Sequence, residues 1–123
     1  MLTFWQYVII VAIMATGGWM HVISKRPFSE AARNYPKHAT SLERVYRALK
    51  KGNFATPDAM RRIFPSLDNF KYRNKWWVID IAGNTLRLIA FIQFSQNRIY
   101  VKHILTHADY DKLSRLSMRG ELN

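Results

Sequence analysis

Side chains able to bind phosphate or move protons gather between Thr85 and Lys112. They are Arg87, Lys102, His103, His107, Asp109 and Tyr110. The segment also has the apolar alternation of two β-strands with one buried face, joined by a turn at 95–97. The alternating apolar residues are Leu86, Leu88, Ala90, Ile92 and Phe94, then Ile99, Val101 and Leu105. A hairpin core needs none of the polar side chains, so we expect chemistry here.

Several standard sites are excluded or disfavoured by the same sequence. His103 and His107 have the i, i+4 spacing of helical metal ligands, but His103 falls in a strand pattern. The chain has no glycine-rich phosphate loop and no G-x-S-x-G elbow. Its zero Cys exclude a thiolate metal site, a disulfide and a Cys nucleophile, which fits a reducing cytoplasm. We therefore predict no metal site and no cofactor.

Length and charge point to one small basic domain. With 123 residues and 49% hydrophobic content, the chain can bury one compact core. The formal net charge is +11, from 19 Lys and Arg against 8 Asp and Glu. An excess of this size repels itself, which favours a polyanionic partner, either nucleic acid or an acidic protein. The alternative is a surface that is merely solvated.

Residues 1–19 form an apolar extension with no charged side chain. Their length is marginal for a membrane span, and no Lys or Arg precedes them as in a secretory signal. If they are an anchor, Lys25 and Arg26 would hold the following domain on the cytoplasmic side. Two other interpretations stay open. The segment is a helix packed on the domain, or Met20 is the natural start and the extension is mis-assigned.

From Met20 onward the pattern changes to that of a folded domain. A short strand is predicted over 20–24, followed by a helix that Pro27 opens and Pro36 closes. Thr40 and Glu43 have the spacing of a capping box for a second helix, which ends before Gly52.

The remaining elements follow from turn and capping signals. A third, short helix starts with Thr56 as N-cap and stops at Pro65. Turn residues at 73–75 and 82–84 then separate three antiparallel strands, and residues 99–105 form a fourth. A last helix is predicted over 107–118. Helices ahead of a twisted antiparallel sheet make an α+β plan.

Three segments resemble the HigB family of type II toxins, within the RelE-like superfamily of small messenger-RNA endonucleases. They are FPSLDNFKY (64–72), GNTLRLIAFIQF (83–94) and YVKHILTHADYDK (100–112). The resemblance runs from Met20 to about Met118, and in the family the chain characteristically begins with the first strand. It therefore favours Met20 as the start, with 20–123 as the RelE-like toxin domain. The implied fold has N-terminal helices packed on a twisted, mainly antiparallel sheet of four to five strands, with a short C-terminal helix.

The function implied by the resemblance is cleavage of messenger RNA, generally during translation in the ribosomal A site. A HigA-like antitoxin, which carries a helix-turn-helix for DNA, would neutralise the toxin, so DNA would be contacted only through the antitoxin. The 2′-hydroxyl of RNA attacks the adjacent phosphate, so the enzyme needs no metal, only a base, a charge clamp and an acid. The alternative is a non-catalytic basic module that binds and regulates RNA or DNA.

The resemblance also assigns roles to the residues of the hairpin and the last helix. Arg87 matches the family's strand arginine, whose guanidinium can hold two phosphate oxygens. His107 matches a position near the cleaved phosphate, and an imidazole suits proton transfer. Tyr110, one helical turn on, either stacks on a base, shares the proton or packs on the sheet. Asp109 either orients His107 or fills an acidic helix-start position. Lys102 completes the catalytic candidates as a further phosphate contact.

Loop cations before the hairpin extend the expected substrate-binding surface. Lys71, Arg73 and Lys75 would contact phosphates without reading bases, and we group Asp109 with them. The pair Trp76-Trp77 places one indole on each sheet face, and the sequence does not decide which one is core. Unlike better-studied RelE relatives, the chain has no Arg or Lys directly beside His107. The assignment of acid and base therefore stays open.

Overall fold

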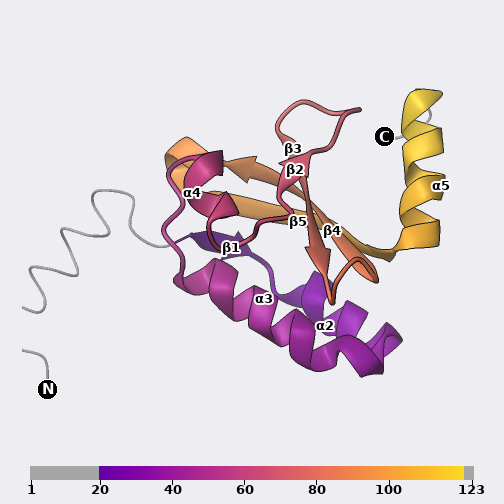
Figure 1. Cartoon of the computed structure of the whole chain (residues 1–123), viewed down its shortest axis with the longest axis horizontal. Helices are drawn as coiled ribbons and strands as arrows, with labels where there is room; N and C mark the ends of the chain where they lie inside the picture. The colour runs from indigo at the N-terminus through magenta and orange to yellow at the C-terminus, as the bar shows by residue number, and fades with distance from the viewer. Residues whose placement is uncertain (1–19, 121–123) are drawn as a thin grey trace, which may run out of the picture.

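The computed structural model describes residues 20–120, whose helices surround one central sheet (Figure 1). The elements in chain order are β1 (His21–Ile23), α2 (Arg26–Asn34), η1 (Pro36–His38), α3 (Ala39–Lys51), α4 (Pro57–Arg61), β2 (Asp68–Asn69), β3 (Trp76–Ile81), β4 (Leu86–Gln93), η2 (Phe94–Gln96), β5 (Arg98–Thr106) and α5 (His107–Met118). The apolar extension 1–19, with its three interpretations, lies outside the described residues. Within 20–120, no helix is both long and apolar enough to cross a membrane.

The strands form one five-stranded sheet in the order β1-β5-β4-β3-β2. β1 pairs with β5 in parallel, and the other neighbouring pairs are antiparallel. The four predicted antiparallel strands are β2 to β5, and the short N-terminal strand adds a fifth at the edge. The predicted α+β, RelE-like architecture is therefore confirmed, including the last helix over 107–118.

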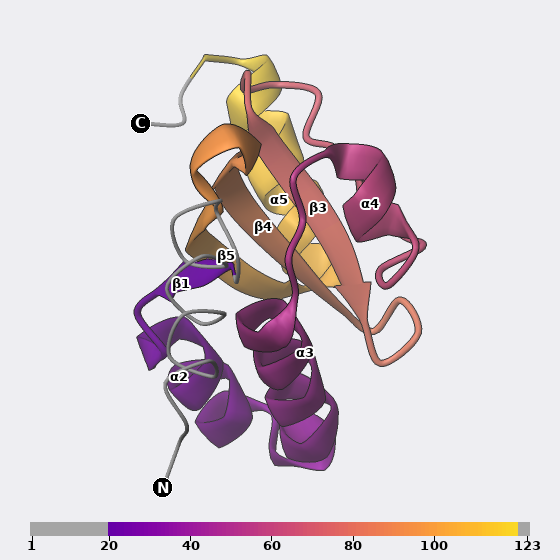
Figure 2. The same cartoon turned by 90° about the vertical axis from the view of Figure 1, so that its left-hand side faces the viewer.

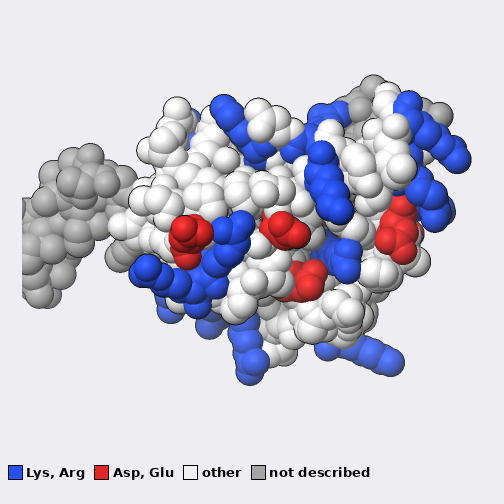
Figure 3. Space-filling model, turned by 45° about the horizontal axis from the view of Figure 1, so that its top comes forward, with Lys and Arg blue, Asp and Glu red and all other residues white. Residues whose placement is uncertain are grey.

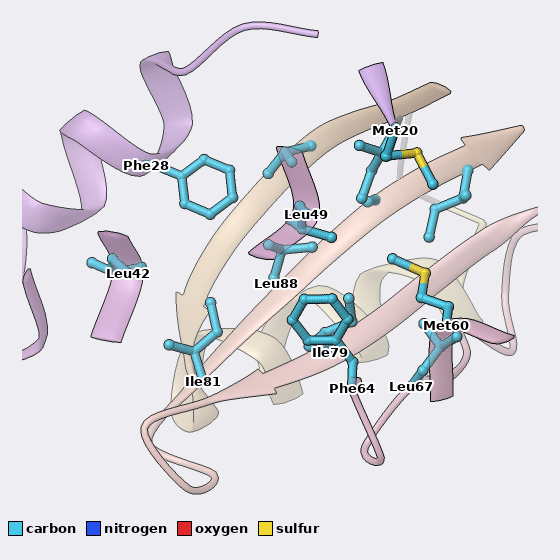
Figure 4. Packing of buried hydrophobic residues seen from close by; sticks show 14 of the residues in the cluster. Met20, Phe28, Leu42, Leu49, Met60, Phe64, Leu67, Ile79, Ile81 and Leu88 are labelled. Carbon is cyan, nitrogen blue, oxygen red and sulfur yellow. The ribbon is translucent and has the colours of Figure 1, made fainter. Parts of the chain in front are cut away.

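The two faces of the sheet are covered by different helices. α2 and α3 pack side by side against one face, and α5 lies against the other (Figure 2). Alternation along β4 sends Leu86, Leu88, Ala90 and Ile92 into the α2–α3 face, where each is at most 2% exposed. This main core also contains Phe28, Leu42 and Leu49 from the helices, and Figure 4 shows these side chains pointing toward the strands.

A β-bulge interrupts the pairing of β4 with β5. Ile89 pairs with His103, whereas the next residue, Ala90, pairs with Val101. Lys102 is therefore an extra residue on β5 with no partner opposite it. Such a bulge bends the strand and re-aims the side chains that follow it.

Because of the bulge, the last two apolar residues of β5 lie on the opposite sheet faces from those that strict alternation would give. Ile104 packs against the main core, and Leu105 packs on the α5 side. The prediction that Leu105 shares the buried face of Ile99 and Val101 is therefore wrong. A period of two holds only along an unbroken strand, and the extra residue shifts it by one position.

The predicted capping box at the start of α3 is also wrong. The helix begins at Ala39, whose φ of −57° and ψ of −42° are already helical, because η1 runs directly into it. Thr40 therefore lies inside the first turn and lacks the extended backbone of a cap. Glu43 instead pairs with Arg47 at 3.1 Å and with Lys25 at 3.7 Å.

The other helix starts agree with the sequence. Thr56 is the N-cap of α4, and its hydroxyl accepts a hydrogen bond from the Ala59 amide at 3.2 Å. Thr106 caps α5 in the same way, accepting from the amide of Asp109 at 3.3 Å. Because Thr106 is the last residue of β5, the strand and the helix meet without a loop, and the first turn of α5 is fixed to the sheet.

Candidate active site

Arg87 lies near the start of β4, on the α5 side of the sheet. The turn between β3 and β4 sets the register, which places Arg87 between Asp80 of β3 and Leu105 of β5. Its Nε is 3.5 Å from the Asp80 Oδ1, and the two side chains are 22% and 32% exposed. The guanidinium is thus held at a position that solvent and a ligand still reach.

Tyr110 covers the Arg87 guanidinium from α5. The Arg87 Cζ lies 4.5 Å from the centroid of the Tyr110 ring. The same ring packs edge-on against Phe70, with centroids 6.2 Å apart. Tyr110 therefore packs on the sheet, as one open interpretation holds, and in doing so it also fixes the plane of the guanidinium.

The hydrogen-bonding capacity of Arg87 is not used up by the fold. Its Nε is buried, and among residues 20–120 it has no hydrogen-bond partner. The contact between Nε and Asp80 is a longer ion pair of 3.5 Å, which leaves this donor without a hydrogen bond. An unsatisfied buried donor is costly, so an anion with several acceptor oxygens would be stabilised at this position.

His107 is the first residue of α5 and is well exposed. Its Nε2 lies 3.6 Å from the Oδ2 of Asp111, one turn further along the helix. Asp109 occupies the acidic helix-start position, with its amide bonded to Thr106. Asp109 is expected from the sequence either to orient His107 or to fill an acidic position at the helix start. Its position in the structure agrees with the second interpretation. The carboxylate beside the imidazole belongs to Asp111.

The sheet register brings three of the predicted catalytic residues to one end of the β4–β5 ladder. Leu105 pairs with Arg87, and His107 follows Leu105 by two residues. Tyr110 is on the first turns of the same helix and touches Arg87. Arg87, Tyr110 and His107 are therefore neighbours by topology, and we call this set the α5-end cluster.

The other predicted site residues lie elsewhere. The Lys102 Nζ is 5.9 Å from the Tyr100 ring, and the Arg73 Cζ is 4.8 Å from the Trp76 ring. Lys71 and Lys75 are exposed in the loop between β2 and β3. Figure 3 shows Lys and Arg in several separate groups over the visible face, with a few Asp and Glu between them. The catalytic role of Lys102 stays a prediction.

The two adjacent tryptophans divide between the faces as predicted. Trp77 packs against the main core, with its ring perpendicular to that of Phe94 at 5.4 Å. Trp76 lies on the α5 side, beside Phe70 at 6.0 Å. Trp76 is therefore the indole on the face that carries the α5-end cluster.

His103 lies on this face as well, opposite Ile89 and beside the bulge. Burial lowers the pKa of His103 below its usual value, and the charge of Lys102 lowers it further. Within residues 20–120, no three His, Cys, Asp or Glu side chains come together in an arrangement that could hold a metal ion.

Replacing His103 with glutamine is expected to reduce the pH dependence of folding stability. Because the pKa of His103 is lowered by folding, the unfolded chain binds a proton that the folded chain resists. Stability is therefore full above the ordinary value of 6.5 and is lost as pH falls from there toward the lowered pKa. Urea unfolding of parent and variant between about pH 8 and pH 5 measures the difference. Lys102→Gln removes only the smaller cause and should keep most of the dependence. Parallel stability profiles for parent and His103→Gln would contradict this account.

Sequence reasoning missed the two carboxylates of the site. Asp80 and Arg87 pair across a four-residue turn at 82–85, whereas the predicted turn at 82–84 would have paired Asp80 with Leu86. Asp111 stands four residues after His107 in a predicted helix, which is the spacing of neighbouring side chains on one face. The sequence therefore contained a usable signal for Asp111, but its predicted turn did not indicate Asp80.

The fold is that of a small basic α+β protein, and comparison with known proteins identifies it as one of the RelE-like toxins. A family model described as HigB_toxin, RelE-like toxic component of a toxin-antitoxin system, matches residues 38–113. The chain is 58% identical over 96 residues to the mRNA interferase HigB of Escherichia coli O6:H1, covering 78% of this chain and 93% of that protein. It is 39% identical over 92 residues to the mRNA interferase toxin HigB of Escherichia coli K12, covering 75% and 88%. The chain belongs to the HigB toxin family, as its three matching segments predict.

Proposed function

We propose that this chain is the toxin of a type II toxin–antitoxin system and acts as a messenger-RNA endonuclease. Its family and the names of its relatives support this activity. The observation that carries it for this chain is the Arg87 guanidinium, stacked on Tyr110 at 4.5 Å with Nε unsatisfied, at the end of the ladder where His107 begins α5. In this proposal, Arg87 of the α5-end cluster holds the phosphate and His107 transfers a proton.

The reaction we propose uses the RNA's own 2′-hydroxyl and no metal. The 2′-oxygen forms a bond to the neighbouring phosphorus, and the bond from phosphorus to the 5′-oxygen breaks. A base takes the 2′ proton and an acid gives a proton to the departing 5′-oxygen, which leaves a cyclic phosphate and a 5′-hydroxyl. His107 fits one of these proton-transfer roles, and Tyr110 either fits the other or stacks on a base.

Arg87 would stabilise the charge that builds on the non-bridging phosphate oxygens during this step. A planar guanidinium offers parallel donors to two oxygens, and a group already held in place loses little freedom when the transition state forms. Asp80 and Tyr110 provide that fixed position in the free protein. The phosphate would compete with Asp80 for the same donors.

The proposal also covers the cellular location of cleavage, the residues that contact RNA and the partner proteins. Cleavage would take place on translated messenger RNA in the ribosomal A site, in the cytoplasm, with activity residing in residues 20–123. Lys71, Arg73, Lys75 and Lys102 would contact phosphates, and Asp109 would lie at the edge of the substrate. A HigA-like antitoxin would neutralise the toxin and contact DNA on its behalf. A membrane would be involved only if residues 1–19 are a genuine anchor.

Induced expression of the parent chain is expected to arrest growth and to produce cut transcripts, whereas Arg87→Ala should do neither. Primer extension on total RNA after induction locates the cuts, and Arg33→Ala, an exposed arginine of α2, is the matched control that should behave like the parent. If the parent and Arg87→Ala both arrest growth and no transcript is cut, the nuclease assignment fails. The chain is then better explained as a basic binding module.

A further inference from the structure

Three aromatic side chains form a row across the α5 side of the sheet, which we call the aromatic row. The register pairs Trp76 of β3 with Phe91 of β4, and Phe91 with Tyr100 of β5. All three are partly exposed, and the rings of Phe91 and Tyr100 lie 5.8 Å apart. Partly exposed aromatic side chains therefore lie at paired positions on three adjacent strands.

Packing within residues 20–120 accounts for Trp76 but not for Phe91 and Tyr100. The small core beneath α5 consists of Phe70, Val78 and Ile89, with Trp76 at its margin. Phe91 and Tyr100 belong neither to that core nor to the main core on the other face, as far as residues 20–120 show. Large rings left outside both cores on an open sheet face are typical of surfaces that stack bases.

Cations stand at both ends of the row. The Arg73 guanidinium lies over the Trp76 ring at 4.8 Å, and the Lys102 ammonium lies 5.9 Å from the Tyr100 ring. Lys102 is the extra residue of the β-bulge, and within 20–120 it takes part in no ion pair. Rings flanked by cations complement a ligand that has flat bases and a charged backbone.

The row also stands at a useful distance from the α5-end cluster. Phe91 follows Arg87 on β4 by four residues and faces the same side, which corresponds to about 13 Å along the strand at about 3.3 Å per residue. A single strand of nucleic acid with one phosphate at Arg87 can therefore cover the row with neighbouring nucleotides. A double helix keeps its bases stacked inside and cannot use the ring faces in this way.

We propose that the aromatic row is a base-stacking subsite for single-stranded RNA, on which nucleotides close to the cleaved bond lie. The inference rests on the proposed function for its substrate class. Stacking tolerates any base because every base has a flat face. The row would thus hold the strand in place while leaving sequence choice to other contacts.

The test measures binding of a fluorescent 12-nucleotide RNA whose 2′-hydroxyls are all methylated, so that it cannot be cut by 2′-hydroxyl attack. Anisotropy titrations compare the full-length parent with Tyr100→Leu, which removes the ring, and Tyr100→Phe, which keeps it. Tyr46→Leu is the matched control, because Tyr46 also has two lysines near its ring, Lys25 at 5.1 Å and Lys50 at 5.9 Å, but packs on the opposite face. A second oligonucleotide with the same phosphates and abasic sites tests the parent without any mutation.

Tyr100→Leu is expected to weaken binding about 5- to 150-fold, the range for losing one stacked base, with Tyr100→Phe and Tyr46→Leu close to the parent. The abasic strand should bind the parent at least as weakly as the methylated strand binds Tyr100→Leu. Lys102→Gln should instead lower the slope of log affinity against log salt by about 0.7, the share of one phosphate contact.

Equal affinities of the parent for the two strands, or parent-like binding by Tyr100→Leu, would overturn the inference and leave the row as a surface for a protein partner. If Tyr100→Leu does not fold by circular dichroism, the comparison of the two strands on the parent still decides. Failure of the proposed function shows separately, because a parent that cuts no transcript can still discriminate between the two strands.

Discussion

Replacing Arg87 with lysine is expected to lower messenger-RNA cleavage by about 10²- to 10³-fold, the usual cost of losing one preorganised charge-stabilising group. Lysine keeps the positive charge beside Asp80, so the fold should survive. It loses the planar pair of donors and the stacked contact with Tyr110, which fix the direction from which a phosphate is held. The rate loss should be the same at every pH, because the exchange does not change a proposed proton-transfer group.

Single-turnover cleavage rates measured across pH test this expectation. Arg33→Lys, in the last turn of α2, makes the same exchange at an exposed position and should leave the rate unchanged. Thermal melting of each variant separates a lost clamp from a lost fold. An Arg87→Lys variant that keeps more than about a tenth of the parent rate would show that charge alone suffices, and that the geometry of the guanidinium is not used.

His107→Gln is expected to fail differently from Arg87→Lys. Glutamine keeps a hydrogen-bonding side chain of similar reach but cannot transfer a proton, so the rate should fall about 10²- to 10⁴-fold. The variant should also lose the limb of the pH–rate profile that an imidazole produces. Because the side chain is about half exposed at the end of α5, the substitution should leave the melting temperature nearly unchanged.

Two further variants test whether the effect is specific to His107. His38→Gln, on η1, repeats the substitution away from the α5-end cluster and should have no effect on the rate. Asp111→Asn should lower the rate by less than His107→Gln, because a carboxylate 3.6 Å from the imidazole orients it without reacting. If His107→Gln cleaves like the parent while Tyr110→Phe is inactive, the proton-transfer role belongs to the tyrosine.

Most of the fold could be read from the sequence because local signals and burial agree there. The alternation along 86–92 matches β4, and the positive φ angles of Ala82 and Gly83 occur where the turn was predicted. The start of the last helix follows directly after its cap, Thr106. In each case the residues that determine the element are close together in the chain, so a short stretch of sequence is enough to predict it.

The parts that could not be read depend on residues distant in the chain. The stacking of Tyr110 on Arg87 requires α5 to fold back over β4, which no local pattern specifies. The unpaired position of Lys102 and the changed face of Leu105 depend on a bulge that becomes visible only when β4 and β5 are paired. The resemblance to the HigB family named Arg87 and His107 as site residues, but their carboxylate partners came from the register and the helix spacing.

The order of the strands also affects how readily two copies of the protein could associate through the edges of their sheets. Within residues 20–120, the two long apolar strands, β4 and β5, are both interior. The edge strands of this part of the sheet are β1, with three residues, and β2, with two. An edge this short offers few free backbone groups, so a second molecule finds little template for adding a strand. The short edge strands therefore limit strand addition to the apolar hairpin formed by β4 and β5.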